Sequence, residues 1–596
     1  MEGITGRSKE GWVKYYIGLS VTYHDPAIAI VDEKGKVLFA EATERYMQNK
    51  RALNCVADPL LRVQDLLAQY CPSADEFIIA INWRRKRPLY ENIISALGCL
   101  TATGLTRTGI KRLRSPLENY QLHHMIASQR NSISSAGLNL ARIIAEYYPN
   151  CTVRHADYQH HLTHAATACY SSSFSEAACA VIDSFGEKGS MAFYHFKNQR
   201  FECLYETKGT GSLGFYYMKI TELCGFNWLK GEEWKVMGLA PYGKLNPELY
   251  ELLKSTVTVQ GFDCLHDSKN LFLSIDMLER FKRHGLNSIE QAADLAFTGQ
   301  YFFAELMSKL LQYLQQVTGC KNLALGGGCA LNSAFNGQIK IRTDFEQIFI
   351  PSAPADDGTA LGAAWLAFQQ AQPALPLTDD NKLLSPYLGS EINNAEVERL
   401  IQNNHCLDIQ YLPDSICEVT AELLAKGQLV GWVQGRAEYG PRALGNRSIL
   451  ADPRQAVTKD IINQKIKFRE SFRPFAPSVL HEHADSFFEN YHESPYMDKT
   501  LKLRDSMQEQ VAAVCHIDGT ARLQSVTQER NERFYSLINL FYQRTQVPML
   551  LNTSFNVMGK PLIHSLDDAI SVFLTTGLDV LAINDYLIAK PQNEKV

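Results

Sequence analysis

A pair of short apolar segments separated by a polar turn occurs twice in this chain of 596 residues. In the first copy, residues 16–19 and 27–31 flank a turn that contains residues 24–26, with the sequence His-Asp-Pro. In the second copy, residues 177–182 and 191–196 flank another turn of polar residues and glycine. Short apolar runs bounded by turn-forming residues are typical of buried β-strands. The repetition therefore predicts two related halves with a cleft between them.

The first half begins with three predicted strands, because a further apolar segment at residues 37–42 follows the first pair. A three-stranded start with a polar loop after the first strand is typical of a ribonuclease-H-like sheet, whose first hairpin loop often holds a phosphate. The pattern predicts an α/β fold. Residues 58–150 lack it, and we expect them to form a mainly helical insert.

A polar segment that contains three prolines, residues 371–387, is the predicted boundary between two domains. Proline interrupts helices and strands, and clusters of such residues mark linkers. A new succession of predicted helices and strands starts after this segment, which is typical of an independent domain. We therefore expect an N-terminal domain at 1–370 and a C-terminal domain at 388–596.

The composition excludes several classes of protein. The formal net charge of −5 gives no overall attraction to nucleic acid, so any anion site must be local. The chain begins without an apolar segment and has no run of about 18 apolar residues, so neither a signal peptide nor a membrane helix is expected. The fourteen cysteines form no C-x-x-C pair, which argues against zinc knuckles and a disulfide framework. We expect a cytoplasmic protein.

Three histidines lie within the five residues 160–164. On a helix, His160 and His164 would share one face because residues four apart are neighbours there. A predicted buried strand ends at Asp183, and a pair of aspartates that begins at Asp356 precedes a glycine turn. Two imidazoles and two carboxylates suit iron(II), manganese or zinc better than calcium. The alternative is that these side chains only pack against or cap a helix.

Two glycine-containing segments could hold a nucleotide. Consecutive glycines after a predicted strand allow a ligand to approach the backbone, although they match neither the P-loop nor the dinucleotide fingerprint. Residues 231–243 contain too many glycines for a helix interior and are expected to form a loop over a ligand, with Lys235 facing a phosphate. An aspartate such as Asp356 also suits a ribose hydroxyl. The predicted nucleotide-binding residues are Lys235, Gly326, Gly327, Gly328, Asn332 and Asp356.

The C-terminal domain contains the clearest candidate for an anion site. Arginine presents a planar fork that fits phosphate or carboxylate oxygens in a bidentate manner. Prolines and glycines surround these arginines, which favours fixed loops over a solvated helix face. The competing interpretation is a nucleic-acid surface, but the basic residues form no continuous stripe. The predicted set for a small phosphorylated substrate is Arg442, Lys467, Arg473, Arg522, Asn552 and Ser554.

Across nearly its full length the chain resembles the NodU/CmcH-type O-carbamoyltransferases. The resemblance depends on Gly18-Leu19 with His24-Asp25, the His160/His164 pair, residues 235–243 (KVMGLAPYG), 440–445 (GPRALG), 472–477 (FRPFAP), 516–522 (HIDGTAR) and 552–556 (NTSFN). Several such strings in the same order are highly specific. Members of the family carbamoylate hydroxyls of nodulation signals, antibiotics and alkaloid toxins.

The resemblance implies an N-terminal domain like the tRNA threonylcarbamoyl transferases, on the duplicated actin-like fold, and a YrdC-like C-terminal domain. It implies that carbamoyl phosphate and ATP, with magnesium, form carbamoyl-adenylate in the C-terminal domain, and that a hydroxyl of a small molecule receives the carbamoyl group in the N-terminal domain. By motif, the iron(II) ligands would be His160, His164, Asp183 and Asp356, with His161 as the rival of His160 and Asp357 as the rival of Asp356.

The acceptor hydroxyl needs a base within hydrogen-bond reach, for which His24 is the candidate and Asp25 the alternative. Other functions considered are a tRNA-modifying enzyme of the threonylcarbamoyl class, a hydrogenase-maturation carbamoyltransferase, and a nucleotide-binding sensor or sugar kinase. The arginines of the C-terminal domain distinguish the first prediction from a kinase, which has no use for them.

Overall fold

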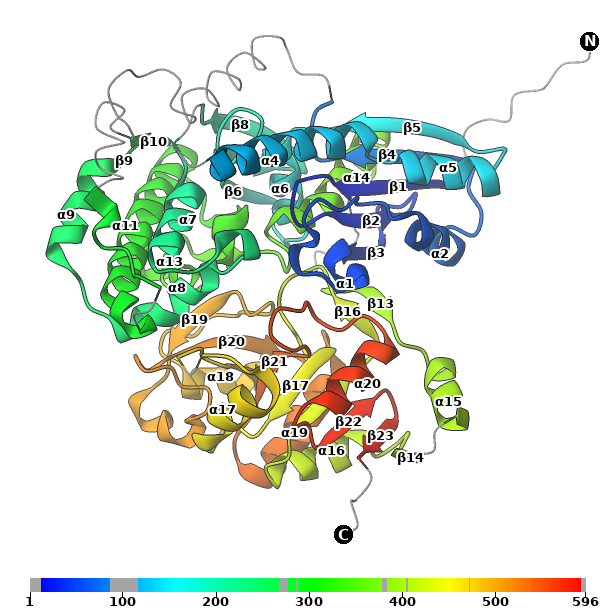
Figure 1. Ribbon diagram of the computed structural model, residues 1–596. Coiled ribbons are helices and arrows are strands. Elements are labelled where there is room, and N and C mark those ends of the chain that lie inside the picture. The colour runs from blue at the N-terminus through cyan, green and yellow to red at the C-terminus, as the bar shows by residue number, and fades with distance from the viewer. Residues whose placement is uncertain are drawn as a thin grey trace, which may run out of the picture.

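Figure 1 shows a computed structural model in which the N-terminal part of the chain lies above the C-terminal part. The structure describes residues 12–85, 116–208, 211–266, 277–285, 288–377, 383–403, 406–470 and 472–590.

Two five-stranded sheets form the centre of the N-terminal part (Figure 1). The first has the order β3-β2-β1-β4-β5 and consists of β1 (Lys14–Ser20), β2 (Ala27–Val31), β3 (Val37–Ala42), β4 (Glu76–Ile81) and β5 (Thr152–Asp157). The second has the order β8-β7-β6-β11-β12 and consists of β6 (Glu176–Ile182), β7 (Met191–Lys197), β8 (Arg200–Glu206), β11 (Asn322–Gly326) and β12 (Gln347–Phe349).

The two sheets have the same topology. In the first, β1 pairs antiparallel with β2 and parallel with β4. In the second, β6 pairs antiparallel with β7 and parallel with β11 in the same way. Each sheet thus has a central strand with an antiparallel meander on one side and parallel strands on the other. This repetition confirms the predicted duplication and its actin-like α/β fold.

Two helices join the halves: α6 (His160–Tyr170) and α14 (Thr359–Ala371). They cross closely, because a Cβ on Gly362 of α14 would lie 2.0 Å from the carbonyl oxygen of Thr163 in α6. Helix α14 also packs on β1, where Gly18 has no side chain and so lets the two backbones come close together. The halves therefore meet through small residues, and the first turns of both helices lie at the junction.

The segment 58–150 differs from the predicted helical insert. It contains α2 (Leu60–Tyr70), α4 (Pro116–Ser135) and α5 (Leu138–Tyr147), but also β4, which is parallel to β1 in the first sheet. Residues 77–81 are a short apolar run that is buried throughout, a pattern that fits a strand covered on both faces. The prediction missed this strand; residues 86–115 of the segment lie outside the described residues.

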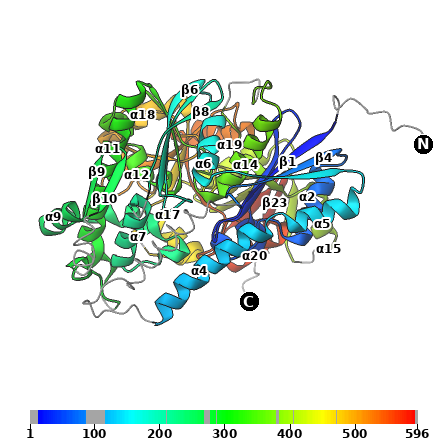
Figure 2. The ribbon, with the colours of Figure 1, turned by 90° about the horizontal axis from the view of Figure 1, so that it is seen from above.

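The second half carries further elements beside its sheet (Figure 2). They are α7 (Leu213–Leu223), α8 (Glu233–Leu239), α9 (Pro247–Thr256), β9 (Val257–Gln260), β10 (Asp263–His266), α11 (Ala293–Thr318), α12 (Ser333–Asn336) and α13 (Ile339–Arg342). Within the described part of the chain, no helix combines the length and the apolar character needed to cross a membrane.

The C-terminal part is built on a nine-stranded mixed sheet with the order β14-β23-β22-β15-β17-β21-β18-β20-β19. Its strands are β14 (Asp408–Tyr411), β15 (Val430–Val433), β17 (Arg447–Ala451), β18 (Ala476–Leu480), β19 (Lys499–Lys502), β20 (Thr520–Val526), β21 (Met549–Ser554), β22 (Val580–Ile583) and β23 (Tyr586–Ala589). Its helices are α15 (Asn394–Asn403), α16 (Ile416–Ala425), α17 (Val457–Ile462), α18 (His481–Phe487), α19 (Glu532–Thr545) and α20 (Leu566–Thr575).

This domain is α/β, so the α/β class of the whole chain agrees with the sequence analysis, and its likeness to YrdC stays a prediction. A small pair of strands, β13 (Tyr387–Glu391) and β16 (Arg436–Glu438), lies where the two domains meet. The predicted linker 371–387 falls between the end of α14 and the start of β13, and the exact domain limits stay a prediction.

Substitution of Gly18 is expected to destabilise the junction of β1 and α14. A Cβ at this position would lie 1.8 Å from the carbonyl oxygen of Ala360, which is backbone and cannot rotate away. We expect Gly18→Ala to lower the free energy of unfolding by about 3 kcal/mol or more, which is the upper end of the usual cost of overpacking. The melting temperature measured by calorimetry should fall accordingly. Gly285→Ala is the control because nothing lies within 4 Å of its Cβ position. Equal melting temperatures for the two variants would contradict the close packing.

Candidate active site

Four of the predicted ligand residues converge at the junction of the two halves. His160 and His164 lie on the first turns of α6, Asp183 follows β6, and Asp356 lies in the turn before α14. The Nε2 atoms of the two histidines lie 3.3 to 3.5 Å from carboxylate oxygens of both aspartates. All four residues are buried. We call this group the His–Asp cluster.

The surroundings of the cluster fix the imidazole rings. His164 Nδ1 lies 3.2 Å from the carbonyl oxygen of Pro354, and its buried Nε2 faces the carboxylates of Asp183 and Asp356 without the geometry of a hydrogen bond to either. The ring of His160 stacks on Trp83 and its Nδ1 lies 3.4 Å from the amide of Asn82. A carbonyl that accepts the Nδ1 proton leaves Nε2 free as a ligand atom, which is the usual arrangement around protein-bound metals.

The charges of the cluster match a divalent cation. Burial disfavours the imidazolium form of His160, but hydrogen bonds to Asp183 and Asp356 outweigh it and raise the pKa of His160 to about 10. The same carboxylates raise the pKa of His164 against the effect of burial. Protonated imidazoles would thus supply the positive charge that a divalent ion supplies. The donor set of two nitrogens and two oxygens therefore fits iron(II), manganese or zinc.

The structure separates the predicted ligands from their rivals. His161 lies beside the cluster with its ring against Gly186. Burial and the charge of His160 lower the pKa of His161 to about 3. The Asp357 carbonyl accepts a hydrogen bond from the Tyr439 hydroxyl, and burial together with Asp25 raises the pKa of its carboxyl to about 7. Neither residue contributes to the four-residue cluster.

The predicted bases lie at the edge of the cluster. His24 Nδ1 is 3.5 Å from an oxygen of Asp356 and 2.9 Å from Asp25 Oδ2. Asp25 has a left-handed backbone with φ of 56°, and its carboxylate pairs with Arg51 at 3.0 Å. Burial opposes ionisation of Asp25, but Arg51 and His24 outweigh it and lower its pKa. Sequence analysis did not find Arg51, because this residue lies in another turn with no motif around it.

Two of the three glycine amides at residues 326–328 make hydrogen bonds within the fold. The Gly327 amide donates to the Pro354 carbonyl at 2.9 Å, and the Gly328 amide donates to Asp183 Oδ1 at 3.1 Å. Asn332 is buried, caps α12 through Phe335 and exchanges hydrogen bonds with Gln300. These groups hold Asp183 and the adjacent turn in place. Their contact with a nucleotide stays a prediction.

The segment 231–243 was expected to be a loop, but it contains α8 followed by a short 3-10 turn. Gly238 is tolerated inside the helix because it faces the C-terminal domain, where a Cβ would lie 3.4 Å from Pro474. Lys235 is buried, and its ammonium pairs with Glu232 at 2.9 Å and with Glu470 at 3.0 Å. Lys235 therefore links the two domains, and a role in binding phosphate stays a prediction.

Basic side chains of the C-terminal domain gather at its face toward α8. Burial and repulsion from Arg442 and Arg469 lower the pKa of Arg522. Burial and the neighbouring Arg473 lower the pKa of Arg469 to about 9. The Nε atoms of Arg473 and Arg522 are buried without a hydrogen-bond partner among the described residues. We call the following set the cationic cluster: Arg442, Lys467, Arg469, Arg473 and Arg522.

The other predicted anion ligands lie beside this cluster. The buried ammonium of Lys467 donates to the Ser554 carbonyl and to the Asn556 side chain, the latter at 2.7 Å, and none of its hydrogen-bond partners among the described residues is a carboxylate. Asn552 donates to the Ala443 carbonyl at 3.2 Å, while its buried Oδ1 has no partner in the described part of the chain. Such unmatched cations and polar atoms are the arrangement that a polyanionic ligand satisfies.

A series of contacts joins the two clusters along the domain interface. From the His–Asp cluster it runs through His24, Asp25 and Arg51, whose guanidinium also donates to the Trp228 carbonyl at 3.1 Å. The neighbouring Lys50 ammonium lies 5.9 Å from the centre of the Trp234 ring. Arg473 of the cationic cluster covers the same ring at 3.9 Å. The two clusters therefore face one interface.

Both domains match family models. Residues 138–365 match the carbamoyltransferase N-terminus and residues 421–590 match the carbamoyltransferase C-terminus. The chain is 37% identical to nodulation protein NolO of Bradyrhizobium diazoefficiens over 72% of this chain and 78% of that protein. It is 38% identical to nodulation protein NolNO of Sinorhizobium fredii over 72% of this chain, and the aligned part spans only 63% of NolNO. The chain belongs to the carbamoyltransferase family.

Solved structures are more distant. Full-length HypF in its phosphate- and nucleotide-bound form aligns with 61% of this chain and 56% of that chain, at a TM-score of 0.35 and 9% identity. A ROK family glucokinase from Streptomyces griseus, in complex with glucose and AMPPNP, aligns with 59% of this chain and 98% of that chain, at a TM-score of 0.26 and 11% identity. Likeness at this level supports no statement about function.

Proposed function

We propose that this protein is an ATP-dependent O-carbamoyltransferase that works in two steps at two sites. In the first step, carbamoyl phosphate and water give carbamate and phosphate, and the carbamate oxygen attacks the α-phosphorus of ATP. Pyrophosphate leaves and carbamoyl-adenylate remains. In the second step, a hydroxyl of a small molecule attacks the carbamoyl carbon and releases AMP.

The cationic cluster is the observation that carries the first step. The arginines of the cluster repel one another, and burial makes their charged forms less favourable still. The negative phosphoryl groups of two substrates would offset this repulsion. Arg522 and Arg473 present buried N–H groups without partners, which suit phosphoryl oxygens. Fixed cations placed where charge develops are usually the largest single contribution to catalysis.

The second step is assigned to the His–Asp cluster. Its four side chains would hold a divalent metal, which when bound would act as a Lewis acid toward phosphoryl and carbonyl oxygens. His24 lies next to the cluster and is paired with Asp25, so its imidazole is oriented to accept the proton of the acceptor hydroxyl. Asp25 is held ionised by Arg51 and stays the alternative base.

The interface between the sites supports passage of the adenylate from one to the other. Lys50, Arg51 and Arg473 place positive charge along the path, and Trp234 presents an aromatic face beside it. An anionic intermediate with a purine ring finds both kinds of group there. A sugar kinase or nucleotide sensor would leave the cationic cluster of the second domain without a ligand.

The first step can be measured without knowledge of the acceptor. Purified protein is incubated with ATP, magnesium and carbamoyl phosphate, and phosphorus NMR follows the products. We expect pyrophosphate and phosphate in equal amounts, and no pyrophosphate when carbamoyl phosphate is omitted. Folded, metal-loaded protein that releases no pyrophosphate with both substrates present would overturn the adenylate mechanism.

A further inference from the structure

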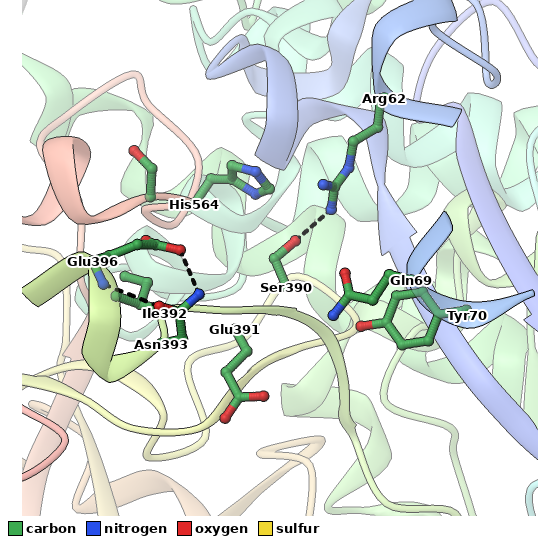
Figure 3. A pocket seen from close by; sticks show the side chains of 10 residues that line it. Arg62, Gln69, Tyr70, Ser390, Glu391, Ile392, Asn393, Glu396 and His564 are labelled. Atoms are coloured by element: carbon green, nitrogen blue, oxygen red, sulfur yellow. Dashed lines mark hydrogen bonds between the residues drawn. The ribbon is translucent and has the colours of Figure 1, made fainter. Parts of the chain in front are cut away.

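A polar cavity of about 250 Å³ lies between the two domains, away from both clusters (Figure 3). Helix α2 of the N-terminal domain lines one side with Arg62, Gln69 and Tyr70. The end of β13, the start of α15 and the loop before α20 line the other side, with Ser390 and His564 among their residues. No residue of the His–Asp cluster or the cationic cluster lines this cavity. We call it the interdomain pocket.

At the floor of the interdomain pocket, the lining residue Arg62 forms an ion pair with Glu41, which is not itself a lining residue. Glu41 is buried, and its carboxylate receives a hydrogen bond from Arg62 at 3.0 Å and from the Ser390 amide at 3.0 Å. Arg62 also donates to the Ser390 hydroxyl at 2.6 Å, which Figure 3 shows. Because Glu41 neutralises Arg62, the floor presents fixed hydrogen-bonding groups without a net positive charge.

Two buried nitrogens at this floor are unsatisfied. Arg62 Nε and His564 Nδ1 have no hydrogen-bond partner among the described residues, although His564 Nδ1 lies 3.5 Å from a Glu41 oxygen. Buried polar atoms of this kind normally find a partner in the protein, in water or in a ligand. A hydroxyl group can accept from an N–H group and also donate, so it suits the exposed polar groups that line the pocket, such as the Gln69 and Asn393 amides.

The rim of the interdomain pocket is acidic and rich in neutral polar groups. It carries the carboxylates of Glu391 and Glu396, and the second of these accepts a hydrogen bond from the Asn393 amide at 2.9 Å. The Gln69 amide and the Tyr70 ring stand opposite (Figure 3). Arg62 is paired with Glu41, and Arg436, whose guanidinium lies 5.5 Å from the centre of the Tyr70 ring, does not line the pocket, so the two rim carboxylates disfavour phosphate and carboxylate ligands, in contrast to the cationic cluster. Amides, hydroxyls and one aromatic face favour a ligand with many hydroxyl groups.

We propose that the interdomain pocket binds a small hydroxyl-rich molecule, about the size of one sugar ring, that is uncharged or carries an amine. Since both domains line the pocket, a bound molecule stabilises their docked arrangement. The inference does not depend on the proposed function, because it concerns other residues and the opposite kind of charge.

Saturation-transfer NMR on the full chain tests the proposal with glucose and glucosamine as probes. We expect transfer to the ring protons of both sugars and tighter binding of glucosamine, because its ammonium faces the acidic rim. Gln69→Trp fills the pocket and should abolish transfer to both. Asp65→Ala, an exposed position on α2 outside the pocket, should change neither.

The charge of the rim is tested separately. Glu391→Gln should weaken glucosamine binding by about 1.5- to 5-fold, the range for an exposed ion pair, and leave glucose unchanged. Excess ATP should displace neither sugar. Absence of transfer from wild-type protein, transfer that persists in Gln69→Trp, or displacement by ATP would each overturn the proposal. If Gln69→Trp does not fold, the response to Glu391→Gln decides between binding at this pocket and binding elsewhere.

Discussion

Arg522→Met is expected to slow pyrophosphate release by about 100- to 1,000-fold while the protein keeps or gains thermal stability. Arg522 lies in β20, its Nε is buried without a partner, and the charges of Arg442 and Arg469 repel it. Without substrate the guanidinium therefore opposes folding, and methionine of similar length removes that cost. With substrate, loss of one fixed charge that stabilises the transition state should reduce the rate by about 100- to 1,000-fold. Pyrophosphate release and calorimetric melting of the same preparation measure both effects.

Arg504→Met is the matched control for this prediction. Its side chain is 44% exposed in the same domain, where it pairs with Asp485 at 3.9 Å. We expect wild-type rates from this variant. Arg522→Lys restores the charge but not the planar fork, so it should recover only part of the activity. A melting temperature that falls sharply in Arg522→Met, together with lost activity, would make Arg522 a structural residue and contradict its role.

Arg522 suits this test better than Arg473, although both belong to the cationic cluster. Arg473 covers the Trp234 ring of the N-terminal domain at 3.9 Å and pairs with Glu470 at 3.2 Å. Its removal would disturb the domain interface as well as the anion site. The stabilities of the two variants therefore distinguish substrate binding from domain docking.

Local patterns predicted the strands and the ligands that lie close to them in sequence. Strands β2 and β3 coincide with the apolar segments predicted at residues 27–31 and 37–42, because turn-forming residues precede and follow each segment. His160 and His164 were predicted from helical spacing alone. Asp183 was predicted from the end of a buried strand, and the structure brings all three together with Asp356.

Features that depend on distant contacts were not predictable in this way. Strand β4 was missed because a buried parallel strand has no alternation, and its partner β1 lies about sixty residues earlier. Arg51 has no motif and reaches Asp25 only through the fold. Arg447 lies two residues after the 440–445 motif, close to the predicted anion ligand Arg442, yet it is fully buried and donates to carbonyls of Gln434 and Gly435. A motif therefore located the region without separating ligands from scaffold.

His164→Ala is expected to remove the bound metal and leave pyrophosphate release within about twofold of wild type. The substitution deletes one of the four side chains that would bind the metal. His164 Nδ1 faces the Pro354 carbonyl, so Nε2 is the ring nitrogen that remains for the metal. Loss of a residue that only supports a metal ligand already reduces metal affinity by about 10- to 100-fold. Loss of the ligand itself should therefore reduce metal affinity by more than about 100-fold. Elemental analysis after dialysis against iron(II) or zinc gives the metal content, and phosphorus NMR gives the first reaction step.

His161→Ala separates the metal ligands from the rest of α6. The residue has the same type, lies on the same helix and is equally buried, but it is not part of the His–Asp cluster. We expect this variant to keep its metal, because Asp183 and Asp356 still face His160 and His164. Metal loss in His161→Ala with retention in His164→Ala would reverse the ligand assignment. Loss of pyrophosphate release in a folded His164→Ala would instead show that the two steps share one site, since the first step uses only groups of the C-terminal domain in the mechanism proposed here.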